Sequence, residues 1–208
     1  MYPLIKPLVD FILAALLTLL GSPLLLLLAL IIKLDSKGPV LFQQKRIGKN
    51  KVAFQIYKFR TMRTDTPKDM PTHLFENPQA FITPIGGFLR KSSLDELPQL
   101  FNILKGEMSF VGPRPALWNQ YDLIQAREEP SQSGKYKVSA NERKPGITGW
   151  AQVNGRDELP IKEKAALDRH YAANMSFLLD GKILFLTFFK VLKREGIQEG
   201  DSQNSKKQ

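Results

Sequence analysis

The 208-residue sequence carries 30 lysine and arginine residues against 20 aspartate and glutamate residues, a formal net charge of +10, and it contains no cysteine. The absence of cysteine excludes disulfide bonds and thiolate metal sites, and a hydrophobic content of 43% excludes a disordered chain. Such a basic chain suits nucleic acid, anionic lipid or an anionic substrate. The apolar N-terminus described next favours lipid over nucleic acid.

Residues 8–32 form an almost wholly apolar run, longer than the roughly 20 residues that cross a bilayer. Pro23 removes a helix hydrogen bond and predicts a sharp kink or break, and the hydroxyl of Ser22 can bond the freed backbone. Lys6 flanks one end and Lys33 the other, so both ends are expected on the cytoplasmic side. A helix broken at Ser22 and Pro23 that enters and leaves by one face satisfies these observations. An ordinary kinked transmembrane helix is the alternative.

Residues 40–44 and 52–59 are expected to form two short strands, because apolar residues alternate in the second, and residues 46–50 between them suit a hairpin turn. The region 45–68 is densely basic. It could bind phosphate, or lie as a solvated hairpin on anionic lipid.

The segment 93–115 holds the adjacent carboxylates Asp95 and Glu96 at the expected start of an amphipathic helix, whose apolar residues follow with helical spacing. Ser93 followed by Glu96 matches a capping box, which would give the acidic pair a structural role. A helix starting at Ser93 would place Pro98 where its ring disrupts the hydrogen bonds. A start nearer Asp95 avoids this clash, and the sequence leaves both alternatives open.

The acidic pair could support phosphoryl chemistry. Adjacent residues on a helix point about 100° apart, so Asp95 and Glu96 are not a matched acid and base across one bond. One carboxylate could attack phosphorus while its neighbour holds Mg²⁺. Arg114, between two prolines, could bind phosphate with its fork of donors. Arg156, in a tight turn, could do the same or be an ordinary surface arginine. The motifs of P-loop hydrolysis, dinucleotide binding and paired-histidine zinc sites are absent from the sequence.

Residues 116–129 and 161–174 are expected to be helical, and residues 130–144 to form a polar loop. Residues 178–191 are strongly apolar with basic residues after them, which is typical of a helix in the membrane interface. A buried core helix is the alternative for this segment. Residues 200–208 are polar and are expected to be disordered.

These motifs together resemble the bacterial sugar transferases, specifically the small monotopic phosphoglycosyl transferases. Such enzymes move a phospho-sugar from a UDP-sugar to undecaprenyl phosphate. The resemblance runs from about Lys6 to Gly196 and is carried by segments 22–23, 58–62, 93–100, 112–115, 145–156 and 171–176.

The resemblance implies an α+β, mostly helical fold. Residues 1–34 would form a re-entrant membrane helix, residues 35–198 a cytoplasmic, membrane-associated catalytic domain with a small β-hairpin and interfacial amphipathic helices, and residues 199–208 a disordered tail. The protein would be monotopic, bound to membrane lipids at the cytoplasmic face of the bacterial inner membrane. The short chain resembles the smallest members of the family, and a homodimer is one alternative left open.

The resemblance also implies the chemistry. Asp95 would attack the β-phosphate of the UDP-sugar, release UMP and carry a covalent phospho-sugar until undecaprenyl phosphate accepts it. Glu96 would hold Mg²⁺ and Arg114 would bind phosphate. The remaining residues that would line the site are all basic, namely Lys58, Arg60 and Arg156.

The sequence departs from the family pattern at two places. Pro7 stands where a second basic residue is common, and residues 139–144 lack an arginine–histidine pair. Nothing in the sequence identifies the sugar. Two rival functions are a membrane-bound Mg²⁺-dependent nucleotide-sugar hydrolase or phosphatase, with water as acceptor, and a non-enzymatic basic membrane adaptor.

Overall fold

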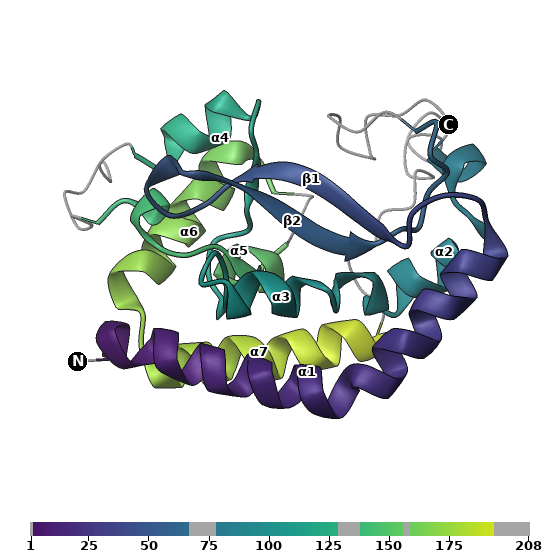
Figure 1. Cartoon of the computed structure of the whole chain (residues 1–208). Helices are drawn as coiled ribbons and strands as arrows, with labels where there is room; N and C mark the ends of the chain where they lie inside the picture. Colours follow the sequence, from purple (N-terminus) through teal and green to yellow (C-terminus); the bar gives the residue numbers. More distant parts are fainter. Residues whose placement is uncertain (1, 67–77, 129–137, 156–158, 194–208) are drawn as a thin grey trace.

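The computed structural model describes residues 2–66, 78–128, 138–155 and 159–193 (Figure 1). Arg156 and the predicted tail 199–208 lie outside the described residues. The helices and strands, in chain order, are α1 (Tyr2–Asp35), β1 (Leu41–Ile47), β2 (Ala53–Phe59), α2 (Pro84–Lys91), α3 (Gln99–Leu104), β3 (Ser109–Val111), β4 (Ala116–Leu117), α4 (Tyr121–Ala126), β5 (Gly146–Thr148), α5 (Trp150–Val153), α6 (Ile161–Asn174) and α7 (Phe177–Lys193). The expected mixture of helix and sheet, with helix dominant, is confirmed.

Helix α1 is continuous over 34 residues, with Pro23 inside it, and Figure 1 shows it bending near its middle. The Ser22 hydroxyl donates to the carbonyl oxygen of Leu19 at 2.8 Å. In a regular helix that carbonyl would accept from residue 23, whose proline nitrogen has no hydrogen. The predicted Ser22 hydrogen bond is therefore confirmed, whereas the expected break is a bend in an uninterrupted helix. By length and composition, α1 could cross a membrane.

Both ends of α1 are fastened to the rest of the molecule. Near its start, the Lys6 ammonium lies 2.6 Å from the Asp180 carboxylate of α7, and both side chains are buried. At its end, the Arg60 guanidinium donates to three backbone carbonyls, those of Ile32 (3.3 Å), Ser36 (2.6 Å) and Lys37 (2.9 Å). A cationic side chain at these carbonyls stabilises a helix C-terminus.

The predicted hairpin is confirmed. Strands β1 and β2 pair antiparallel from Leu41 opposite Phe59 to Ile47 opposite Ala53, and β4 pairs with the other side of β1. Phe54 and Ile56 of β2 are buried as expected. Val52 starts the expected strand 52–59, and its alternation with Phe54 would place it on the same face. It is 66% exposed because it lies before β2, where the short 3₁₀ turn ends.

Asn102 fastens α3 to the free edge of β2. Its side-chain oxygen accepts from the Tyr57 amide at 3.0 Å, and its side-chain nitrogen donates to the Gln55 carbonyl at 2.7 Å. Because β2 has no neighbouring strand on this side among the described residues, the amide provides the two hydrogen bonds that such a strand would supply. Asn102 is fully buried, so α3 is held firmly against the strand that carries Lys58.

The C-terminal half builds around the parallel pair β3 and β5, packed against α5, α6 and α7. Helix α6 has the bounds that the pattern predicts, and α7 contains the predicted apolar helix 178–191. The expected helix 116–129 is wrong at its start. There, Ala116 and Leu117 form β4 and pair with Ile47 and Arg46, and α4 begins only at Tyr121.

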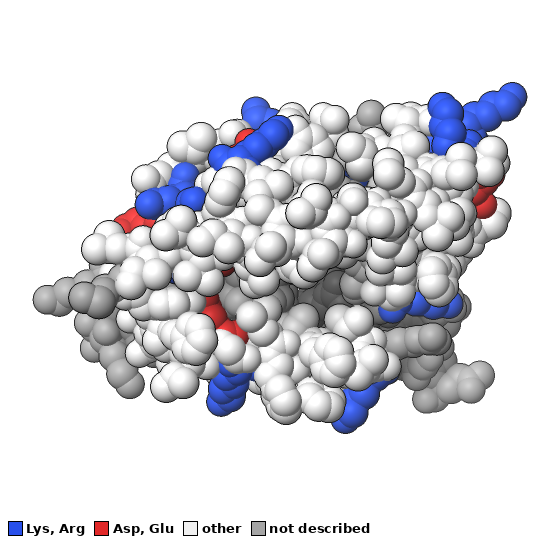
Figure 2. Space-filling model, turned by 60° about the horizontal axis from the view of Figure 1, so that its bottom comes forward, with Lys and Arg blue, Asp and Glu red and all other residues white. Residues whose placement is uncertain are grey.

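The outward sides of α1 and α7 expose large apolar side chains. Leu20 and Leu26 of α1 are 75% and 71% exposed, and Phe177 and Phe188 of α7 are 72% and 60% exposed. In α7 only Asp180 and Ile183 are buried among the described residues, which contradicts the alternative of a buried core helix. Figure 2 shows the underside of the molecule as a broad face with few charges, hollowed near its centre, with lysine and arginine toward its edge.

Candidate active site

The acidic pair lies in a short 3₁₀ turn, Leu94–Glu96, and not in a regular helix. Ser93 before it has a left-handed backbone (φ 56°) and makes no capping hydrogen bond with its side chain, so the expected capping box with Glu96 is wrong. The alternative start near Asp95 is also too early, because α3 begins at Gln99 with Pro98 as its N-cap. A proline is tolerated there because no helical donor is needed. A left-handed non-glycine residue costs energy and often marks a functional site.

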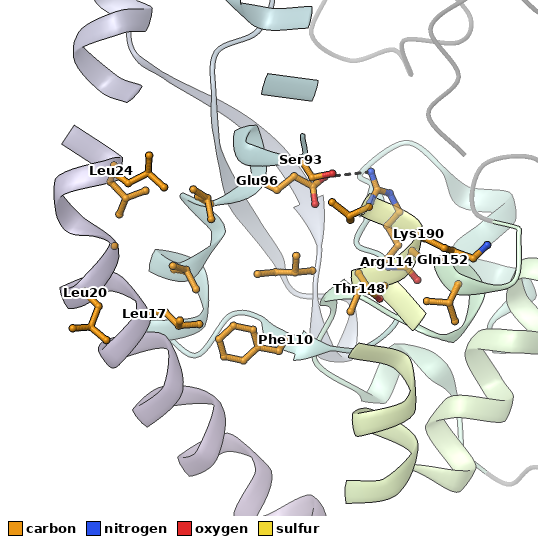
Figure 3. Close-up of a pocket in the computed structure, with 18 of the residues that line it drawn as sticks. Leu17, Leu20, Leu24, Ser93, Glu96, Phe110, Arg114, Thr148, Gln152 and Lys190 are labelled. Atoms are coloured by element: carbon orange, nitrogen blue, oxygen red, sulfur yellow. Dashed lines mark hydrogen bonds and ion pairs between the residues drawn. The ribbon is translucent and has the colours of Figure 1, made fainter. Parts of the chain in front are cut away.

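Two basic side chains converge on the acidic pair. The Lys58 ammonium, from β2, lies 2.7 Å from the Glu96 carboxylate and 3.9 Å from that of Asp95. Arg114, which follows β3, approaches Glu96 at 3.8 Å between Nη2 and Oε1 (Figure 3). Four of the residues predicted for the site are thus brought together, although they are up to 56 positions apart in the sequence.

Burial raises the pKa of the Asp95 carboxyl above its ordinary value. The positive charge of Lys58 opposes this shift most strongly, the adjacent Glu96 carboxylate adds to it, and Arg90 and Arg114 also oppose it. The basic side chains therefore favour the ionised carboxylate, which is the form that can attack an electrophile.

Close backbone packing positions Arg114. A Cβ atom on Gly112 would lie 2.3 Å from the Lys144 carbonyl oxygen, and one on Gly149 would lie 2.1 Å from the Gly112 carbonyl oxygen. Only glycine permits this approach. It presses the turn that carries Arg114 against the segment around β5.

A buried ion pair holds the same turn from the other side. Arg127 donates from Nη2 to the Arg114 carbonyl at 2.8 Å and to the Asp168 carboxylate at 2.7 Å, with a second bond from Nε to Asp168 at 2.9 Å. Both side chains of the pair are almost fully buried. Sequence reasoning missed this pair, because its members are 41 positions apart and neither forms a recognisable local motif.

Arg60, predicted to line the site, has a different position. Both of its terminal nitrogens donate to the end of α1, including the Ser36 hydroxyl at 2.9 Å. Arg60 as a whole is only 4% exposed. This geometry supports a structural role and not the predicted contact with substrate phosphate.

A cavity of about 750 Å³ lies between α1, α3, β5 and α7, a size suited to a small-molecule ligand. One wall of the cavity consists of α1 leucines, among them Leu17, Leu20 and Leu24 (Figure 3). Glu96 and Arg114 also line the cavity. Lys58 and Asp95 do not line it. The cavity therefore joins an apolar helix to the charged groups of the site and reaches Glu96 from a side other than that of Lys58.

The acidic pair suits a magnesium ion bound jointly with substrate. In the described part of the chain, no cluster of three or more histidine, aspartate or glutamate side chains could hold a metal by itself. Mg²⁺ is commonly held by one or two carboxylates together with substrate phosphates and water. Asp95 and Glu96, which already share the Lys58 cation, provide that donor set.

Comparison with known proteins identifies the family of the chain. The family model described as bacterial sugar transferase matches residues 1–194. The chain is 41% identical over 196 residues to the uncharacterized sugar transferase EpsL of Bacillus subtilis, covering 94% of this chain and 91% of EpsL. It is 41% identical to the UDP-glucose:undecaprenyl-phosphate glucose-1-phosphate transferase of Escherichia coli, covering 90% of this chain and 40% of that protein. It is 39% identical to the UDP-N-acetylgalactosamine-undecaprenyl-phosphate N-acetylgalactosaminephosphotransferase of Aeromonas hydrophila, covering 92% of this chain and 44% of that one.

The chain therefore spans less than half of the length of the Escherichia coli and Aeromonas hydrophila relatives. Because the family model covers residues 1–194, which include all of the described residues, the chain belongs to the bacterial sugar transferase family.

Proposed function

We propose that this protein transfers a phospho-sugar from a UDP-sugar to undecaprenyl phosphate, yielding undecaprenyl-diphosphate-sugar and UMP. The observation that carries the proposal is the meeting of two kinds of surface. The carboxylates and basic groups suited to phosphoryl transfer adjoin a cavity whose wall is the apolar helix α1. Such a site suits an acceptor that is both a phosphate and a long hydrocarbon. The relatives with named substrates act on undecaprenyl phosphate.

The transfer proceeds in two displacements at one phosphorus atom. In the first, a carboxylate oxygen of Asp95 bonds to the β-phosphorus of the UDP-sugar. The bond from that phosphorus to the bridging oxygen breaks, and UMP leaves with that oxygen. In the second, a phosphate oxygen of undecaprenyl phosphate bonds to the same phosphorus, and the bond to Asp95 breaks. The carboxylate is regenerated, so no external base or oxidant is needed.

The basic residues stabilise the negative charges of the carboxylates and of the substrate phosphates. Lys58, within 4 Å of both carboxylates, favours the ionised form of Asp95 and faces the incoming diphosphate. Arg114 provides a planar fork of donors for phosphate oxygens, and the Arg127–Asp168 pair fixes its backbone. Glu96 would hold Mg²⁺, which when bound neutralises phosphate oxygens. Arg156, outside the described residues, stays a predicted phosphate contact.

The membrane arrangement is part of the proposal. Residues 1–34 form a re-entrant helix in the cytoplasmic leaflet of the bacterial inner membrane, and residues 35–198 form the cytoplasmic catalytic domain. Both ends of α1 bond to one folded body, through Lys6 with Asp180 and through Arg60. A helix that crossed the bilayer would place its two ends on opposite sides of a hydrocarbon core about 30 Å thick. The exposed aromatic face of α7 lies in the same interface.

The test is UMP release by the purified full chain in detergent, with Mg²⁺, undecaprenyl phosphate and a panel of UDP-sugars. The expected result is UMP formation with at least one sugar, dependent on the lipid phosphate and lost in Asp95→Asn. Asp122→Asn, at an exposed carboxylate of α4, is the matched control and should remain active.

The rival functions give different results in the same assay. Sustained UMP release without lipid would indicate a nucleotide-sugar hydrolase. No UMP with any sugar, together with unchanged membrane binding by Asp95→Asn, would indicate a non-enzymatic adaptor.

A further inference from the structure

The wall of the cavity opposite α1 carries an amide whose hydrogen-bonding capacity is unused. Gln152 of α5 has both its side-chain oxygen and its side-chain nitrogen buried, and neither has a hydrogen-bond partner among the described residues. The two threonines on that wall, in contrast, have hydrogen-bond partners. The hydroxyls of Thr148 and Thr187 bond to each other at 2.7 Å. Burying a polar group without a hydrogen-bond partner is unfavourable, so such an amide in a cavity points to a polar ligand.

The same wall carries a lysine in an apolar setting. Lys190 of α7 lines the cavity, and within the described residues no carboxylate lies within ion-pair distance of it. Its helix otherwise exposes mainly large apolar side chains, such as Phe185 and Phe189. In Figure 3, Lys190 and Gln152 lie next to Arg114, across the cavity from Leu20 and Leu24. Two nitrogen donors and a guanidinium thus gather at the polar end of a space that is otherwise apolar.

We infer that Gln152 and Lys190 form the binding site for the phosphate of the lipid acceptor, with its hydrocarbon chain along the leucines of α1. This inference rests on the function proposed above and assigns its two phosphates to two sides of the site. The donor diphosphate approaches Lys58, which is outside the cavity. The acceptor phosphate approaches from the cavity, which reaches Glu96 and Arg114. The lysine ammonium and the amide N–H donate to the phosphate oxygens, and the amide oxygen accepts from the lysine or from a protonated phosphate oxygen.

The two displacements allow the inference to be tested separately from the function. With UDP-sugar and no lipid, the enzyme should release one UMP per active site, which reports only the first displacement. Adding undecaprenyl phosphate then transfers the labelled phospho-sugar to lipid, which reports only the second. For Lys190→Met the UMP burst should keep its rate and amplitude, and the rate of transfer at low lipid concentration should fall roughly 10- to 100-fold. Gln152→Leu should behave alike, with roughly a 10-fold fall.

Two further variants separate site binding from general effects. Lys190→Arg keeps the charge and should restore most of the transfer rate. Lys193→Met removes an exposed charge one turn further along α7, outside the cavity wall, and should leave both steps unchanged. Thermal unfolding of each variant checks that the fold is intact.

Each outcome decides the inference. A selective loss in the second step, with Lys193→Met unaffected, supports it. It is overturned by an equal loss in both steps, by the same loss in Lys193→Met, or by folded variants that transfer at the wild-type rate. If the wild type itself releases no UMP with any UDP-sugar, the proposed function fails, which is a different result from these.

Discussion

The turn that carries Arg114 can be displaced by one methyl group, and the structure sets the size of the displacement. In Gly112→Ala, the added Cβ would lie 2.3 Å from the Lys144 carbonyl oxygen, whereas ordinary contacts begin near 3.4 Å. The backbone must therefore move by about 1.1 Å, the difference between these distances. Overpacking of this kind costs about 1–3 kcal/mol. A misplacement of about 1 Å in a positioned group can cost about 100-fold in rate.

We therefore expect Gly112→Ala to lower the free energy of unfolding by about 1–3 kcal/mol and to slow UMP release roughly 100-fold. The control is Gly87→Ala in α2, where an added Cβ meets nothing within 4 Å. That change should stabilise the fold by about 0.5–1 kcal/mol and leave the rate unchanged, because alanine favours helix more than glycine does. The measurements are thermal unfolding and steady-state UMP release. Wild-type rate and stability in Gly112→Ala would refute the argument that the close approach positions Arg114.

Three further changes test other parts of the structure. Asp95→Asn should reduce activity roughly 10⁴-fold or more without destabilising the protein at neutral pH. Burial raises the pKa of Asp95 in the fold above its ordinary value of 3.8, so ionisation of this carboxyl opposes folding. The stability advantage of Asp95→Asn over the wild type should therefore grow as pH rises from the ordinary pKa to the raised pKa and stay constant above it, whereas wild-type activity should fall as pH drops through the raised pKa. Lys6→Met leaves buried Asp180 without its cation, and should cost about 3–5 kcal/mol in unfolding experiments, much of it recovered in the double variant with Asp180→Asn. Asn102→Ala removes both hydrogen bonds to the edge of β2 and should cost about 2–4 kcal/mol; stability equal to that of the wild type would show that water replaces the amide.

Features that depend on neighbouring residues were predictable from the sequence. Alternation predicted the hairpin, helical spacing predicted the bounds of α6, and the Ser22–Pro23 step predicted the hydrogen bond to the preceding turn. The sequence also singled out the acidic pair and Arg114, whose residue types and motifs point to phosphate chemistry, and the fold brings Arg114 to Glu96.

Features that depend on distant partners were not predictable. Arg60 has a side chain suited to binding phosphate, and only the fold brings this guanidinium to the carbonyls at the end of α1. The Arg127–Asp168 pair joins α6 to the segment after α4. The capping pattern itself was ambiguous, because the serine–x–x–glutamate spacing occurs twice. The box forms at Ser139, whereas Ser93 adopts a left-handed backbone instead.

If Asp95 carries the phospho-sugar between donor and acceptor, the enzyme passes through a covalent adduct. The most direct measurement is the intact mass of the protein after incubation with Mg²⁺ and its UDP-sugar, without lipid. We expect one added phospho-sugar per chain, an equal amount of UMP, loss of the adduct on addition of undecaprenyl phosphate, and no adduct in Asp95→Asn. An unmodified protein that releases UMP only after lipid is added would contradict it, because transfer would then occur in a single displacement.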